Sequence, residues 1–151
     1  MKLLTALALT LTLAASAQAA PAPVAVTGAW SRPAVAGTNG VGYMTLANRG
    51  ETTEALVAVE SPLAARVEMH ATSMDGGVMS MARLDRVVVP AGSRVAFAPG
   101  AYHLMLIGLT RTVKVGDQIP ATLTFASGAK LKTSFTVAMG PAAATMDHMH
   151  P

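Results

Sequence analysis

Four residues with nitrogen or sulfur side chains recur at a spacing that suits metal binding: His70, Met81, His103 and Met105. Ten residues separate His70 from Met81, and twenty-one separate Met81 from the His-x-Met motif. Imidazole nitrogen and thioether sulfur together favour a soft, monovalent ion, which indicates copper(I) over zinc, magnesium or calcium. The set therefore predicts a carrier of copper(I).

The only other histidines lie near the C-terminus, within Met146-Asp147-His148-Met149-His150. We interpret four residues there as candidate ligands of a secondary copper site, which could also take copper(II): Met146, His148, Met149 and His150. The alternative is an exposed stretch that binds copper only incidentally.

The first nineteen residues have the features of a signal peptide. Lys2 supplies a positive charge, an apolar run follows, and Ala17-Gln18-Ala19 matches the small-x-small cleavage pattern. We expect cleavage near Ala19, export to the periplasm, a single domain over residues 20–140 and a flexible tail over 141–151. No apolar run reaches the roughly 20 residues that a membrane-spanning helix needs, so no stable membrane insertion is expected.

Composition excludes several classes of function. The sequence contains no cysteine, which removes a bacterial lipoprotein anchor, blue-copper electron transfer, iron–sulfur clusters, Cys-ligated zinc and c-type haem attachment. The formal net charge is only +3, the arginines are scattered and the aromatics are few. No nucleic-acid partner is therefore expected.

Ten short apolar segments with turn signals between them predict an all-β, antiparallel β-sandwich. No window with a helical period is long enough to indicate a helix. The predicted strands are 24–30, 42–48, 55–60, 65–70, 78–84, 86–89, 94–98, 102–109, 118–125 and 131–137.

The segment from Arg66 to Asp85 reads as a hairpin. Asp75-Gly76 is a strong signal for a type I′ turn, and with these residues at the turn His70 opposes Met81. Charged residues then pair on the face of His70, and apolar residues pair on the other face. Gly77 offers an alternative, a bulged loop that shifts the pairing by one residue.

The second ligand pair follows from strand alternation. Pro99-Gly100 fits the centre of a type II turn that begins strand 102–109. His103 and Met105 then point to one face of that strand. The residues alone do not show that this pair meets His70 and Met81.

The other methionines have simpler explanations. Met is a flexible filler of protein cores, and we interpret Met44, Met69 and Met139 in this way. Met79 shares the strand face of Met81, so it is a candidate auxiliary ligand or relay.

Several segments resemble the periplasmic copper chaperones that serve cytochrome c oxidase assembly, the PCu(A)C family. The similarity lies in residues 67–70, 75–81, 89–92 and 99–106, and it extends from about Val24 to Val137. The family spacing His-x10-Met-x21-His-x-Met is met without a gap.

The resemblance implies a cupredoxin-like β-sandwich of the Greek-key type and copper(I) held by His70, Met81, His103 and Met105. It implies delivery to cytochrome c oxidase subunit II, directly or with Sco-type copper proteins, and no enzymatic turnover. The tail resembles an extension that some members carry as a further copper site.

Two other classes of function remain as alternatives. One is a non-metal β-sandwich interaction module, in which Met residues only pack and His residues lie on the surface. The other is a copper redox enzyme, against which stands the absence of the open, His-rich coordination that copper(II) chemistry prefers.

Overall fold

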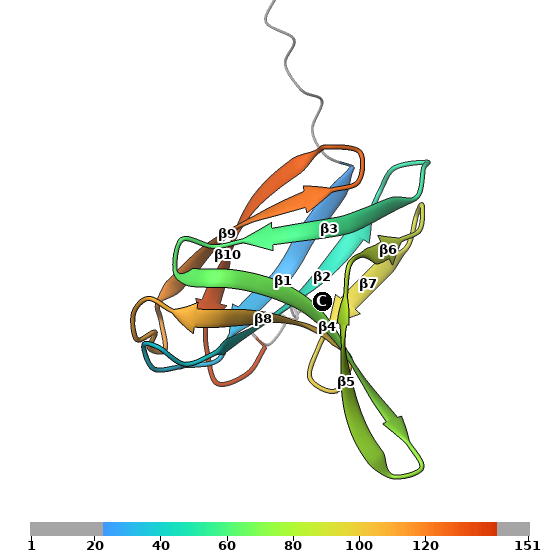
Figure 1. Cartoon of the computed structure of the whole chain (residues 1–151). Helices are drawn as coiled ribbons and strands as arrows, with labels where there is room; N and C mark the ends of the chain where they lie inside the picture. The colour runs from blue at the N-terminus through green and yellow to red at the C-terminus, as the bar shows by residue number, and fades with distance from the viewer. Residues whose placement is uncertain (1–22, 142–151) are drawn as a thin grey trace, which may run out of the picture.

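Ten strands form in residues 23–141, the part of the chain that the computed structural model describes (Figure 1). The predicted signal peptide, its cleavage point, and the tail ligands from Met146 to His150 lie outside the described residues. The strands are β1 (Val24–Ser31), β2 (Gly40–Asn48), β3 (Glu54–Glu60), β4 (Ala64–Asp75), β5 (Val78–Leu84), β6 (Val87–Val89), β7 (Arg94–Phe97), β8 (Tyr102–Leu109), β9 (Gln118–Phe125) and β10 (Lys130–Val137). The prediction of an all-β chain is confirmed.

Strand bounds follow the apolar segments closely, with one exception. The predicted bounds of β5, β8 and β9 match the structure, and most others differ by one or two residues at an end. β4 is the exception, because it continues past His70 to Asp75. This extension builds the hairpin that carries Met81.

The strand order is β5-β4-β8-β7-β2-β1-β10-β9-β3-β6, with a further pairing of β8 to β2. Most neighbours are antiparallel, as predicted, but β1 pairs with β10 and β7 with β8 in parallel. The order curls so that β4, next to one end, lies against β3, next to the other (Figure 1). The two ends of the sheet thereby enclose one core.

Side-chain alternation decides which residues fill that core. Leu104 and Leu106 of β8 are fully buried in it, together with leucines and phenylalanines from β2, β3, β9 and β10. His103 and Met105 alternate with these leucines in the sequence, so they belong to the opposite face of β8. Over residues 23–141, no helix has the length and apolarity needed to cross a membrane.

The prediction of core methionines is partly wrong. Met44 and Met69 are buried, as expected for packing residues. Met139 is 78% exposed, because β10 ends at Val137 and the chain leaves the sheet there.

A hairpin projects beyond the edge of the sheet. β4 pairs with β8 only as far as Ala71, whereas its pairing with β5 continues to Asp75. Residues 72–81, which we call the arm, therefore pair as strands only with each other, and Figure 1 shows them extending away from the body. At the base of the arm, the backbone N–H of Thr72 still donates to the carbonyl oxygen of Ala101 at 3.1 Å. The arm begins two residues after His70, and the Gly76-Gly77 turn forms its tip.

The predicted register of the arm is wrong by two residues. Asp75 pairs with Val78, so the central turn residues are Gly76 and Gly77, with φ of 55° and 80°. A type I′ turn needs positive φ at both positions, and two glycines adopt it without the steric cost that Asp75 would carry. The one-residue bulge that Gly77 suggested does not form either. A shift of two residues leaves every side chain on its predicted face.

Candidate metal centre

The two histidines of the body face each other across neighbouring strands. His70 of β4 pairs directly with His103 of β8, and their ring centroids lie 5.7 Å apart at an interplanar angle of 30°. The sequence predicted Met81 opposite His70, and this is wrong: Arg83 occupies that position. The structure instead brings together two imidazoles that are far apart in the sequence.

The two methionines flank this pair on the same face of the sheet. Met105 lies two residues beyond His103 on β8 and opposes Glu68 of β4. Met81 of β5 opposes Thr72, which places it diagonally across from His70. All four predicted ligands therefore share one face of three adjacent strands, β5, β4 and β8.

Exposure rises steadily across this face. His103 is only 6% exposed, and the side chain of His70 is also largely covered, whereas Met81 is 59% exposed. Met81 is two strand spacings from β8, a backbone separation of about 10 Å. A methionine side chain has three rotatable bonds beyond Cα and can reach inward over β4. The site has a fixed imidazole side and an adaptable thioether side.

Glu68 sets the protonation pattern of the His70 ring. Its carboxylate Oε2 lies 3.0 Å from Nε2 of His70, and this hydrogen bond is the main reason that the pKa of Glu68 is lowered. An ionised carboxylate can only accept, so Nε2–H donates and the neutral ring keeps its lone pair on Nδ1. That Nδ1 is buried and has no hydrogen-bond partner among residues 23–141.

A backbone carbonyl does the same for the second ring. Nδ1 of His103 lies 3.3 Å from the carbonyl oxygen of Ala101. Because a carbonyl only accepts, Nδ1–H donates and Nε2 keeps the lone pair. Metal-binding histidines characteristically have this arrangement, with one ring nitrogen held by an oxygen and the other free for the metal.

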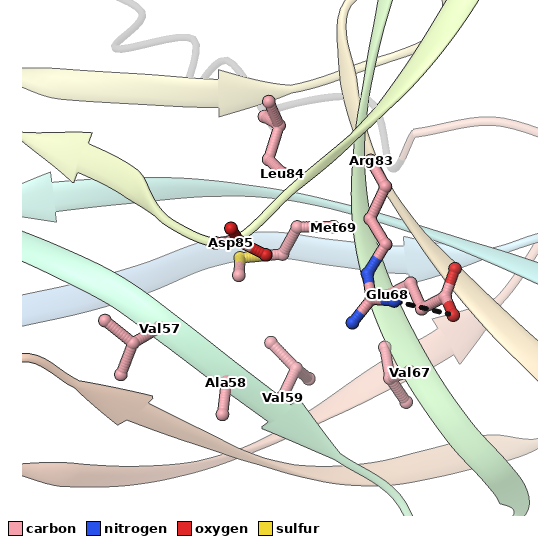
Figure 2. Close-up of a pocket in the computed structure, with 9 residues that line it drawn as sticks. All are labelled: Val57, Ala58, Val59, Val67, Glu68, Met69, Arg83, Leu84 and Asp85. Atoms are coloured by element: carbon pink, nitrogen blue, oxygen red, sulfur yellow. Dashed lines mark ion pairs between the residues drawn. The ribbon is translucent and has the colours of Figure 1, made fainter.

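Glu68 contacts a candidate ligand, and the sequence did not identify it as part of the site. It also accepts from Nε of Arg66 at 2.9 Å and forms an ion pair with Arg83 at 3.8 Å, drawn dashed in Figure 2. Both contacts help to lower its pKa. The signal was present in the sequence, because residues two apart on a strand lie on the same face, and Glu68 is two residues before His70.

A neighbouring pocket has Glu68 and Arg83 in its lining, but neither of the two histidines nor Met81 or Met105. It has a volume of about 210 Å³ and lies between β3 and the β4–β5 pair, with Val59, Met69 and Leu84 in its wall (Figure 2). These residues belong to the inward face, away from His70. The candidate metal centre is thus on the outer face of the sheet, not in this pocket.

The donor set at the centre is selective. In the described part of the chain, no three His, Cys, Asp or Glu side chains form a cluster that could hold a metal ion. Zinc sites use such nitrogen, oxygen or thiolate sets, and calcium requires many oxygens. Two imidazoles with thioethers suit copper(I) better, so the residues fit the ion that the sequence indicated.

Comparison with known proteins adds the family. A family model described as “Putative lipoprotein LpqE-like” matches residues 24–137, which covers the whole β-structure. The chain belongs to the LpqE-like family. A relative, “Putative lipoprotein Lxx21020” of Leifsonia xyli subsp. xyli, is 32% identical over 106 residues, or 70% of this chain. The match spans 63% of that relative's own length.

Solved structures similar to this LpqE-like chain are PCuAC domains. The copper-bound PCuAC domain from PmoF2 is 25% identical with a TM-score of 0.65, covering 78% of this chain and 94% of that domain. The solution structure of CuI-DR1885 from Deinococcus radiodurans is 31% identical with a TM-score of 0.57, covering 82% of each chain. The predicted cupredoxin-like fold and the resemblance to the PCu(A)C family are confirmed.

Proposed function

We propose that this LpqE-like protein is a periplasmic copper chaperone that binds copper(I) through His70, Met81, His103 and Met105. It delivers the ion to the copper centre of cytochrome c oxidase, directly or through Sco-type proteins. It is a carrier and catalyses no reaction.

The observation that carries this proposal is the pair of opposed imidazoles. Nδ1 of His70 and Nε2 of His103 are left with lone pairs because the other nitrogen of each ring donates to an oxygen. A buried nitrogen without a partner costs stability, which binding of an ion to Nδ1 of His70 would recover. Copper in the similar PCuAC domain of PmoF2 and copper(I) in DR1885 support the choice of ion.

The four side chains have different roles in transfer. The buried His103 and the largely covered His70 fix the position of the ion, and the exposed Met81 is the ligand that an acceptor can displace first. All four ligands bind in the neutral state, so release requires no protonation of a thiolate. Thiolates of an acceptor bind copper(I) and can replace the thioethers one at a time.

The C-terminal residues Met146, His148, Met149 and His150 supply the same donor types. We propose that they capture copper before it reaches the main site, including copper(II), for which imidazole is the better donor. Copper-binding stoichiometry of the full chain with these four residues replaced by alanine tests this role. A stoichiometry equal to that of the parent chain would contradict it.

Competition with a copper(I) chelator in the absence of oxygen tests the main site. Met81→Leu and His103→Ala should each weaken copper(I) binding, because each removes one donor. Met139→Leu is the matched control, since it removes an exposed thioether that lies on none of the three strands of the site. Equal copper(I) affinities for the parent protein and the three variants would refute the site. An absence of copper(I) binding by the parent protein would favour a non-metal interaction module.

Delivery is tested separately by mixing the copper-loaded protein with an acceptor. The acceptors are the copper-free soluble domain of oxidase subunit II and a reduced Sco-type protein. After separation of the partners, metal analysis should find copper on an acceptor. Retention of copper by the chaperone with both acceptors would contradict the delivery step while leaving the binding site intact.

A further inference from the structure

The arm has a face that consists largely of methionine. Met74 of β4 pairs directly with Met79 of β5, next to the turn, and Met81 follows Met79 two residues along β5. These three side chains share the face of His70, because the pairs Met74–Met79, Thr72–Met81 and His70–Arg83 alternate along the same two strands. The thioethers therefore form a row from the tip of the arm toward the candidate metal centre.

Packing does not account for this row. Met74, Met79 and Met81 are 67%, 60% and 59% exposed. The opposite face of the arm is different in kind: there Ser73 and Ser80 share a hydrogen bond of 2.8 Å between their hydroxyl oxygens. Methionines that fill a core are buried, as Met44 and Met69 are.

The pair at the tip has the geometry for a shared ion. Directly opposed residues on antiparallel strands have Cβ atoms about 4.5–5.5 Å apart, so two long side chains can bring their sulfur atoms to one ion. Thioether sulfur selects copper(I) among the biological metals. Met81 is one side-chain step, roughly 7 Å along β5, from Met79.

We propose that Met74 and Met79 form an outer copper(I) site at the tip of the arm, with Met81 as the ligand that this site shares with the inner one. The inference rests on the proposed function, because the ion is the same. Passage between the sites forms one sulfur–copper bond as another breaks. The ion remains copper(I) throughout, so no electron or proton is exchanged.

Methyl resonances of methionine give a site-specific test. The full chain, labelled with carbon-13 at the methionine methyl groups, is titrated without oxygen with copper(I) supplied as its acetonitrile complex. The first equivalent should shift the resonances of Met81 and Met105, and further copper should shift those of Met74 and Met79. Met139 is the internal control, because it is exposed but belongs to neither strand of the arm.

The outcomes separate this inference from the proposed function. Shifts of Met74 and Met79 no larger than that of Met139 overturn the outer site, even when Met105 responds. Shifts of Met74 and Met79 without any response of Met105 support the outer site and contradict the inner one.

A paired substitution gives a second measure. Met74→Leu with Met79→Leu preserves apolar volume and removes both sulfur atoms. The variant should lose the later binding event and keep the chelator-competition affinity of the first, while the tail contributes equally to both proteins. Val78→Ala, on the other face of the same tip, should retain both events. An unchanged titration of the double variant refutes the outer site.

Discussion

The body of the sandwich and its arm use the same strand, β4, in opposite ways. Up to Ala71 the strand is paired with β8, and from Met69 onward also with β5. One of its faces points into the core, where Met69 is buried. Beyond Ala71 it is paired only with β5, and Met74 is exposed. His70 lies at the boundary between the two regions.

Because of this difference, the body determines the stability of the fold and the arm supplies side chains with metal-binding atoms. Burial of apolar surface in the body stabilises the fold, while the arm adds little buried area. Its side chains are therefore free to be chosen for their donor atoms. Changes in the body should alter the free energy of unfolding, and changes in the arm should alter copper binding.

The largest expected effect is the loss of folding stability caused by a substitution in the core of the body. Leu123 of β9 is fully buried, and Leu123→Ala should lower the free energy of unfolding by about 2–5 kcal/mol. Met79→Leu on the arm should change it by no more than about 0.5 kcal/mol. Denaturant unfolding of the metal-free proteins checks both values, and comparable losses in the two variants would remove the distinction.

Glu68, the hydrogen-bond partner of His70, should show the next largest effect. Glu68→Gln removes the ionised acceptor of Nε2–H of His70, and copper(I) affinity should fall about 10–100-fold, as for other oxygen partners of metal-binding histidines. Nitrogen NMR of the imidazoles should show that His70 no longer prefers the Nε2–H tautomer. Glu60→Gln, an exposed glutamate on β3, is the matched control. Unchanged affinity together with a changed tautomer would show that Glu68 has no role in metal binding.

The smallest expected effect is a change in folding stability at a glutamate whose contacts lie only in the body. Glu54 accepts hydrogen bonds from Ser127, and these lower its pKa below 4.5 despite the opposing effect of burial. A lowered pKa means that the ionised form contributes stability at neutral pH, and that this contribution is lost as pH falls through the folded-state pKa.

Glu54→Gln should therefore reduce the free energy of unfolding by about 1 kcal/mol at pH 7, and by less as the pH falls below 4.5. Denaturant unfolding at a series of pH values measures this. Copper(I) affinity should be unchanged, in contrast to Glu68→Gln. A constant difference between variant and parent at all pH values would contradict the assignment.

The sequence predicted the strands well because each depends on a local pattern of apolar residues and turns. It also placed His70 and Met81 on one face, since strand alternation survives a register error of two residues. It chose the wrong turn because Asp-Gly and Gly-Gly both favour a type I′ turn. The pairing of charged residues on the face of His70 then favoured Asp-Gly.

The sequence did not predict that the two ligand pairs lie close together. His70 meets His103 through the pairing of β4 with β8, and no local signal specifies which distant strands become neighbours. The burial of Nδ1 of His70 likewise depends on the fold. The exposed position of Met139 was missed because a lone methionine near a strand end resembles a core residue.

The two edges of the sheet differ in length. At one end of the strand order β6 has only three residues, but at the other end β5 has seven, including Met79 and Met81. An edge strand presents backbone N–H and C=O groups that can pair with a strand of another protein. A strand added along β5 would place alternate side chains directly beside those two thioethers. The same edge that limits the sheet could therefore align an acceptor's ligands with the copper by backbone pairing alone.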